Sequence, residues 1–256
     1  MRITVMGTGG VGGYFGARLA QGGHEVAFVA RGRQLEALRA RGLRVESPLG
    51  DIHLPDVQAT DKPAEIGTAD VVLFTVKLWD TQEAAESVKP LVGESTAVVS
   101  FQNGVVKDDI LRQALGAGHV IGGLCYIAAT IAEPGLIRHS GTLQKLVFGE
   151  YDGSLSPRVR QFRHACAEAG IDAEISDQIE RAIWEKFVFL VGLSGTTTSA
   201  ASTERTVSAS VRPEPGCAAS RLILRALRCV PRGCRRWPGC TASPRPAGPR
   251  AQPRRR

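Results

Sequence analysis

The chain opens with a strand, a glycine-rich loop, a helix and a second strand, and this order strongly limits the fold. Residues 3–6 form a short apolar strand, and residues 7–12 fit the pattern G-x-G-x-x-G. We expect the helix over residues 14–20 and the second strand over residues 25–29. A glycine loop between a strand and a helix is typical of a β-α-β unit that binds a dinucleotide.

Each glycine of the loop has a separate role in such a unit. Gly7 permits a tight turn out of the strand, and Gly9 has no side chain to block a pyrophosphate. Gly12 lets the helix pack close to the strand, so that the free N–H groups at its first turn face the phosphates. The expected phosphate-binding residues are Gly7, Thr8, Gly9, Gly10, Val11 and Gly12.

The residue after the second strand indicates which dinucleotide binds. NAD-binding units usually place Asp or Glu there, to accept a hydrogen bond from the ribose 2′-hydroxyl. This chain has Arg31 and then Arg33, and a guanidinium offers a fork of donors suited to a 2′-phosphate. We therefore predict NADP, with Arg31 on the 2′-phosphate. The alternative is that both arginines are solvated at the start of the next helix.

The following residues continue the alternation of strands and helices. Further strands are expected at 71–76, 97–101, 120–129 and 143–149, with helices at 34–41, 83–91 and 106–115 between or before them. This alternation predicts an α/β fold with a Rossmann-type, doubly wound NADP-binding domain over residues 1–150.

Residues 151–199 change character and are expected to be a linker and the first helices of a helical substrate domain. A helix is expected at 157–169, and a longer one runs from about residue 177 toward Gly195. Because residues 187–193 are apolar nearly all round, this helix needs burial by further helices. We expect an all-α C-terminal domain that is truncated.

The last 57 residues differ sharply from the rest. Residues 1–199 hold 19 basic and 23 acidic side chains, whereas residues 200–256 hold 13 Arg, no Lys and two Glu, with eight of the 14 prolines. Such a tail buries too little apolar surface to order itself. A nucleic-acid-binding arm, a zinc site and a gene end read out of frame after about Ser199 are the alternatives. The cysteines of this tail form no C-x-x-C pair and have no histidine among them. We favour the out-of-frame interpretation, with neither a nucleic-acid partner nor a metal.

No stretch resembles a transmembrane span, and the first apolar segment breaks into glycines too early for a signal peptide. We therefore expect a cytoplasmic protein without a membrane partner.

Three polar residues are candidates for contact with a ligand. Two of them follow expected strands, at the edge where an α/β sheet binds its ligands, and the third lies on the long helix. Lys77 and Asn103 follow expected strands, and Lys186 lies on the long helix, with Ser194 eight residues further along roughly the same face. A lysine in an apolar stretch would have a lowered pKa. The alternatives are a snorkelling Lys186, a solvated Lys77 and a simple turn at Asn103.

Four motifs together resemble the ketopantoate reductase family, the NADPH-dependent 2-dehydropantoate 2-reductases. They are the opening MRITVMGTGGVGG, Val76-Lys77, Gln102-Asn103-Gly104 and Trp184-Glu185-Lys186-Phe187, and the resemblance covers about residues 1–198. It implies reduction of 2-dehydropantoate to pantoate, in pantothenate and coenzyme A synthesis. Hydride would come from NADPH, and Lys186 would act as the catalytic general acid.

The resemblance also assigns roles to other residues. Lys77 would lie along the cofactor, Asn103 would sit between nicotinamide and substrate, and Ser194 would contact the substrate. Leu190 and Ser194 stand where the family often has substrate-binding asparagines, which leaves the 2-keto acid open. The family's serine and glutamate of the C-terminal domain have no counterpart in residues 200–256, and a homodimer is expected only with a complete helical domain.

Three other functions remain open at this point. They are the reduction of a different 2-keto acid, a glycerol-3-phosphate-type dehydrogenase and an NADP-binding protein without catalytic turnover.

Overall fold

The computed structural model describes the backbone of residues 1–206 and the side chains of residues 1–195. Residues 1–195 form one compact unit and residues 196–256 are a separate one. The predictions for the tail from residue 200 onward lie outside the described residues, apart from the backbone of one helix end. None of the helices described has both the length and the apolar character needed to cross a membrane.

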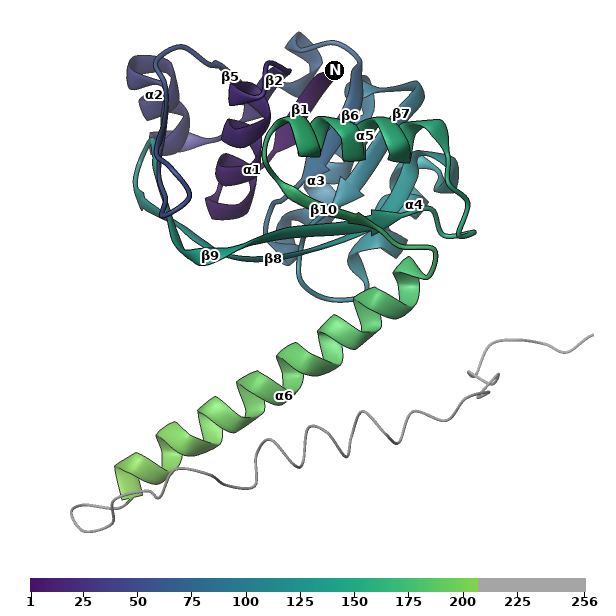
Figure 1. Cartoon of the computed structure of the whole chain (residues 1–256). Coiled ribbons are helices and arrows are strands. Elements are labelled where there is room, and N and C mark those ends of the chain that lie inside the picture. Colours follow the sequence, from purple (N-terminus) through teal and green to yellow (C-terminus); the bar gives the residue numbers. More distant parts are fainter. Residues whose placement is uncertain (207–256) are drawn as a thin grey trace, which may run out of the picture. The chain divides into compact units, whose positions relative to one another are not determined.

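A parallel sheet forms the centre of the compact unit (Figure 1). Six of its strands follow the order β5-β2-β1-β6-β7-β8, and each pairs in parallel with its neighbour. If these six strands are numbered by their order in the chain, their order across the sheet is 3-2-1-4-5-6, which is that of a dinucleotide-binding fold. Their bounds are β1 (Arg2–Met6), β2 (Glu25–Val29), β5 (Gln58–Thr60), β6 (Ala69–Phe74), β7 (Val92–Ser100) and β8 (Val120–Glu133).

A long hairpin extends the sheet beyond β8. The strand β9 (Leu136–Gly149) runs antiparallel to β8, and both are longer than the sequence predicts. The strand β3 (Leu43–Glu46) pairs with β9 and with β4 (Ile52–Leu54), while β10 (Asp172–Ile175) pairs with the other end of β9.

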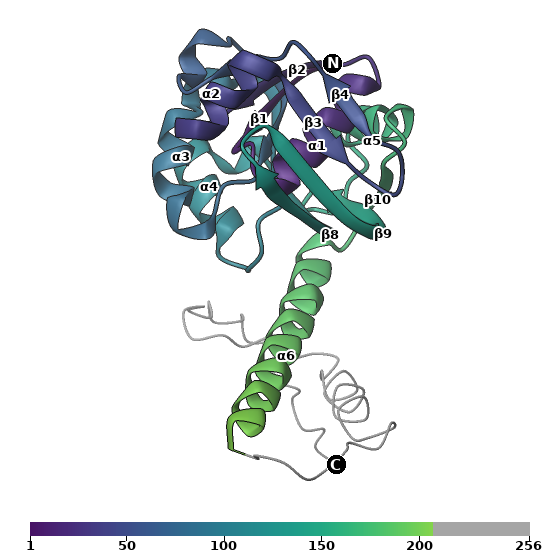
Figure 2. The same ribbon diagram turned by 90° about the vertical axis from the view of Figure 1, so that its left-hand side faces the viewer.

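Helices cover both faces of the sheet, because its strands are apolar on both sides. In β6, Val71 and Leu73 face one core, and Val72 and Phe74 face the other; all four are fully buried. Figure 2 shows α1 and α5 on one side and α3 and α4 on the other. The bounds are α1 (Gly10–Gln21), α2 (Gly32–Arg41), α3 (Thr81–Ser87), α4 (Lys107–Leu115) and α5 (Pro157–Glu168). Short 3-10 turns are η1 (Pro63–Glu65), η2 (Leu78–Asp80), η3 (Lys89–Leu91) and η4 (Ala117–His119).

The predicted Rossmann-type α/β fold is confirmed, although α1 begins earlier than expected. It starts at Gly10 instead of residue 14, so that Gly9 is its N-cap residue and Gly12 lies in its first turn. A Cβ atom at Gly10 would overlap the backbone oxygen of Ala129 in β8. Glycine therefore allows this turn to lie directly against the strand backbone.

The last described element is the helix α6 (Ile179–Thr206). Its start packs Ile179 and Ile183 against Leu124 and Val147 of the sheet. The next turns expose apolar side chains, and Phe189 is 49% accessible. The strand β10 and the helix α5 lie beyond the boundary predicted at residue 150, yet both pack with the sheet. The division into a cofactor domain and a substrate domain stays a prediction.

Candidate dinucleotide and substrate site

The glycine loop is held between the ends of β2 and β6. The backbone N–H groups of Gly7 and Thr8 donate to the carbonyl oxygen of Val29, at 3.2 and 3.1 Å. The Thr75 hydroxyl donates to the carbonyl oxygen of Gly7 at 2.7 Å. Gly7 has a φ of +97°, which L side chains rarely adopt, so this turn requires glycine.

The first turn of α1 is suited to an anion. Gly9 is the N-cap residue, no side chain caps the turn within the described structure, and the turn carries no acidic residue. The N–H groups at a helix start have no partner within the helix, and the helix dipole favours negative charge there. An added Cβ at Gly9 would meet no atom within 4 Å, so Gly9 leaves open space for a pyrophosphate.

Gly9 and Gly12 give a matched pair of variants that separates binding from packing. A Cβ at Gly12 would overlap the Gly7 carbonyl oxygen and the Thr75 hydroxyl, whereas one at Gly9 would point into open space. We expect Gly12→Ala to lower the free energy of unfolding by about 1–3 kcal/mol. Gly9→Ala should leave the melting temperature unchanged and weaken dinucleotide binding. Thermal unfolding and cofactor titration check both, and equal stability losses would contradict these roles.

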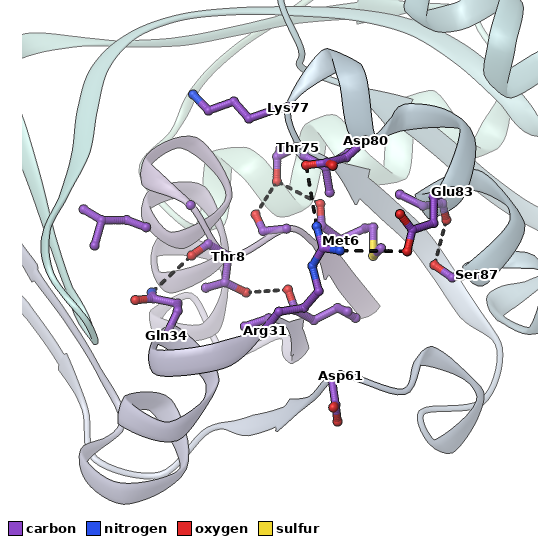
Figure 3. Close-up of a pocket in the computed structure, with 17 residues that line it drawn as sticks. Met6, Thr8, Arg31, Gln34, Asp61, Thr75, Lys77, Asp80, Glu83 and Ser87 are labelled. Carbon is purple, nitrogen blue, oxygen red and sulfur yellow. Dashed lines mark hydrogen bonds and ion pairs between the residues drawn. The ribbon is translucent and has the colours of Figure 1, made fainter.

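A cavity of about 340 Å³ opens beside the loop. Among the residues that line it are Gly7, Thr8, Gly9, Arg31, Gln34 and Lys77 (Figure 3). Its volume lies in the range of ligand pockets. The predicted residues Gly10, Val11 and Gly12 lie in the first turn of α1 and do not line it, and neither does Asn103.

Arg31 lies between β2 and α2, as the sequence predicts, and two acidic residues contact it. Its guanidinium is 3.5 Å from the Asp80 carboxylate and 3.9 Å from that of Glu83. Figure 3 shows the Arg31 side chain extended toward these two acids, with Lys77 pointing away from them. We call Arg31, Asp80 and Glu83 the Arg31 cluster. No sequence pattern identifies these two acids, because about 50 residues separate them from Arg31.

Two further polar residues at the loop were also missed. Gln34 donates from its side-chain amide to the Thr8 carbonyl oxygen and accepts from the backbone N–H of Gly135. Thr75 follows β6 directly, and the rule that ligands lie beyond the carboxyl ends of strands could have identified it.

A second polar group brings two predicted residues together. The Lys186 ammonium donates to the Asn103 side-chain oxygen at 2.9 Å and to the Cys125 carbonyl oxygen at 2.7 Å. It also lies 5.5 Å from the centre of the Tyr126 ring. Since 83 positions separate Lys186 from Asn103, folding alone creates this pair.

Lys186 is buried, with 7% of its surface accessible, so it is not a snorkelling side chain. Burial lowers its pKa below the usual lysine value, and the neighbouring Cys125 partly opposes this effect. An ammonium has three N–H donors, and the structure gives two of them protein acceptors. The third can donate to a ligand.

The end of β7 connects this pair to the cavity. Gln102, which precedes Asn103, donates to the carbonyl oxygen of Val76 at 2.9 Å and to the hydroxyl of Thr81 at 2.8 Å. Val76 lines the cavity and Thr81 begins α3. Asn103 and Lys77 therefore follow two strand ends that are joined by hydrogen bonds.

A buried charged network lies behind the loop that carries Asn103. The Lys107 ammonium donates to the Ser100 carbonyl oxygen at 3.0 Å and to the Asp108 carboxylate at 2.7 Å. The Tyr151 hydroxyl donates to the same carboxylate oxygen at 2.7 Å. Burial lowers the pKa of Lys107, an effect that Asp108 partly offsets, and burial raises the pKa of Tyr151. This network is not among the features predicted from the sequence.

The remaining predicted residue lies further along α6. Ser194 is exposed and stands eight residues beyond Lys186, about 12 Å along the helix axis at 1.5 Å per residue. The structure thus brings Lys186 to Asn103, and it places Ser194 two turns away from that pair.

Comparisons with known proteins show which proteins this chain resembles. The profile of the family described as ketopantoate reductase PanE/ApbA matches residues 3–153. An uncharacterised oxidoreductase, YkpB, of Bacillus subtilis is 33% identical over 77% of this chain and 65% of its own length. A 2-dehydropantoate 2-reductase of Mesorhizobium japonicum is 34% identical over 73% of this chain and 63% of its own.

The solved structure of 2-dehydropantoate 2-reductase from Geobacter metallireducens is also similar. It superposes with a TM-score of 0.71 at 34% identity, covering 75% of this chain and 63% of that one. The chain thus spans somewhat less than two thirds of the length of these relatives. On the profile match and these identities, the chain belongs to the ketopantoate reductase family of oxidoreductases.

Proposed function

We propose that this chain binds NADPH and reduces a 2-keto acid, with 2-dehydropantoate as the substrate and pantoate as the product. The observation that carries the proposal is the buried Lys186 ammonium, hydrogen-bonded to Asn103 at the strand ends that border the cavity. The 2-dehydropantoate 2-reductases among its relatives support this choice of substrate.

The residues around the cavity fit a dinucleotide. The first turn of α1 would bind the pyrophosphate, and Arg31 would bind the 2′-phosphate. Lys77 would lie along the cofactor beyond the end of β6. When bound, the reduced nicotinamide supplies a hydride to the keto carbon of the substrate. Asn103 would stand between nicotinamide and substrate.

Lys186 would act on the keto oxygen. Its third N–H donates a hydrogen bond to that oxygen and so polarises the carbonyl group. As the oxygen gains negative charge, the ammonium transfers a proton to it, and the hydroxy acid forms. Because its lowered pKa weakens its hold on the proton, Lys186 is a better acid than a solvated lysine. Asn103 and Cys125 hold the nitrogen in place by accepting from it.

A second candidate function is an NADP-binding protein without turnover. It is favoured by the exposed apolar side chains of α6 beyond Lys186, such as Val188 and Phe189. NADPH oxidation measured with 2-dehydropantoate, other 2-keto acids and dihydroxyacetone phosphate distinguishes a protein without turnover from an enzyme. It also separates a 2-keto acid reductase from a glycerol-3-phosphate-type dehydrogenase.

Replacement of Arg31 tests the cofactor. We expect Arg31→Ala to raise the Kd for NADPH about 10- to 100-fold, because a charge-assisted bond to phosphate is lost. The Kd for NADH should stay unchanged, since NADH has no 2′-phosphate. Fluorescence titration of both cofactors measures this, and Arg33→Ala is the matched control because Arg33 is outside the cavity lining. Equal effects of Arg31→Ala on both cofactors would contradict the assignment.

A further inference from the structure

Three acidic residues line the cavity in which Arg31 is expected to bind a 2′-phosphate. The lining includes Asp61, Asp80 and Glu83, against two basic residues, Arg31 and Lys77. A strongly cationic lining would be expected of a pocket built only to attract a phosphate dianion. The acids therefore need a role of their own.

Asp61 is paired outside the Arg31 cluster. Its carboxylate lies 3.7 Å from the guanidinium of Arg39. The acids do not form a cation site either, because no three His, Cys, Asp or Glu side chains within the described part of the chain come close enough to hold a metal ion. Asp80 and Glu83 are left as the acids that contact Arg31.

Of the two, Asp80 is the better positioned. It ends the turn η2, where its backbone N–H donates to the Lys77 carbonyl oxygen at 2.9 Å. The next residue, Thr81, accepts a hydrogen bond from Gln102 of the neighbouring strand end. The Asp80 side chain is 31% exposed, whereas that of Glu83 is 81% exposed. Asp80 is thus held on an anchored turn, and Glu83 is a looser second partner.

We infer that Asp80, assisted by Glu83, determines how strongly this site prefers NADPH over NADH, by holding the Arg31 guanidinium in an ion pair that a 2′-phosphate must displace. The inference rests on the proposed function, because it assumes that the cavity holds the adenosine end of the cofactor. A guanidinium bound to a carboxylate has fewer donors free for a phosphate, and the carboxylate also repels the phosphate. NADH presents a neutral hydroxyl there and is not affected in this way.

The test is the ratio of dissociation constants for the two cofactors. We expect Asp80→Asn to lower the Kd for NADPH about two- to fivefold, as for an exposed ion pair, and to leave that for NADH unchanged. Glu83→Gln should act in the same direction and more weakly. High salt should reduce the difference between Asp80→Asn and the unmodified chain, because exposed charges are screened.

Two controls make the result specific. Glu46→Gln removes the same charge from another exposed arginine pair, with Arg138 at 2.9 Å, and Glu46 does not line the cavity. It should leave both Kd values unchanged. In an Arg31→Ala background, Asp80→Asn should lose most of its effect on NADPH, because only the direct repulsion between the Asp80 carboxylate and the phosphate then remains.

The possible outcomes distinguish a failure of the inference about Asp80 from a failure of the proposed function. An unchanged or weakened NADPH affinity in Asp80→Asn overturns the inference, and so does an effect that persists undiminished without Arg31. If the unmodified chain binds NADPH and only the Asp80 result fails, the proposed function stands. If the unmodified chain binds neither cofactor, the proposed function fails and the inference fails with it. All these measurements are binding titrations and do not need turnover.

Discussion

Lys186→Ala is expected to lower the rate of 2-keto acid reduction about 10²- to 10⁴-fold, the usual effect of removing a positioned acid. The ammonium is the group that can protonate the developing alkoxide, and it is buried against Asn103 and Cys125. The Kd for NADPH should change little, because Lys186 does not line the cavity expected to hold the cofactor. Steady-state rates and cofactor titration measure the two effects separately.

The same assignment predicts a pH profile. Lys186 must be protonated to act as an acid, so the rate should fall as pH rises through its lowered folded pKa.

The matched control for Lys186→Ala is Lys145→Ala, because Lys145 is only partly buried and pairs with Glu174 at 2.6 Å, outside the cavity. A rate that is unchanged in Lys186→Ala, or an equal loss in Lys145→Ala, would refute the catalytic role.

Lys107→Met is expected to cause the largest loss of stability, about 3–5 kcal/mol in the free energy of unfolding. Lys107 and Asp108 are both buried, at 1% and 3% accessible, and the substitution leaves the Asp108 carboxylate without its ion-pair partner. Within the described part of the chain one Asp108 oxygen has no hydrogen-bond partner, so after the substitution the Tyr151 hydroxyl would be the remaining donor to this carboxylate there. In a unit of this size, the melting temperature should fall by about 6–20 °C.

Two control variants define this effect. Lys89→Met removes a lysine from an exposed pair with Glu86 and should cost no more than about 1 kcal/mol. Lys107→Met combined with Asp108→Asn removes both charges and should recover part of the loss. Similar losses for Lys107→Met and Lys89→Met would show that the buried pair has no special role in stability.

The sequence predicts the central fold well, because its signals are local. The buried segment Val71–Phe74 of β6 is an unbroken apolar run, and the glycine loop has its own characteristic spacing. The hairpin of β8 and β9 is predicted too short, since residues 130–133 of β8 are exposed and residues 138–142 of β9 are polar or glycine. The length of β8 depends on its pairing with β9 and on the close approach of Ala129 to Gly10.

The site is predicted less completely, because its contacts join distant parts of the chain. Residue type and position after a strand identify Arg31, Lys77 and Asn103 as candidates. Neither signal identifies Asp80 as a partner of Arg31, because an acid after a turn is common on any surface. The Lys107–Asp108 pair is missed for a similar reason: adjacent opposite charges at a helix start usually face solvent, and only the packing of α4 buries them.

The most direct test of the account is the formation of pantoate from 2-dehydropantoate by the purified chain with NADPH. We expect pantoate to form in step with NADPH oxidation, faster with NADPH than with NADH, and we expect Lys186→Ala to stop both. NADPH that binds tightly without any pantoate being formed would contradict the proposed reductase and leave an NADP-binding protein. Equal rates in the intact chain and in Lys186→Ala would contradict the role of the buried lysine.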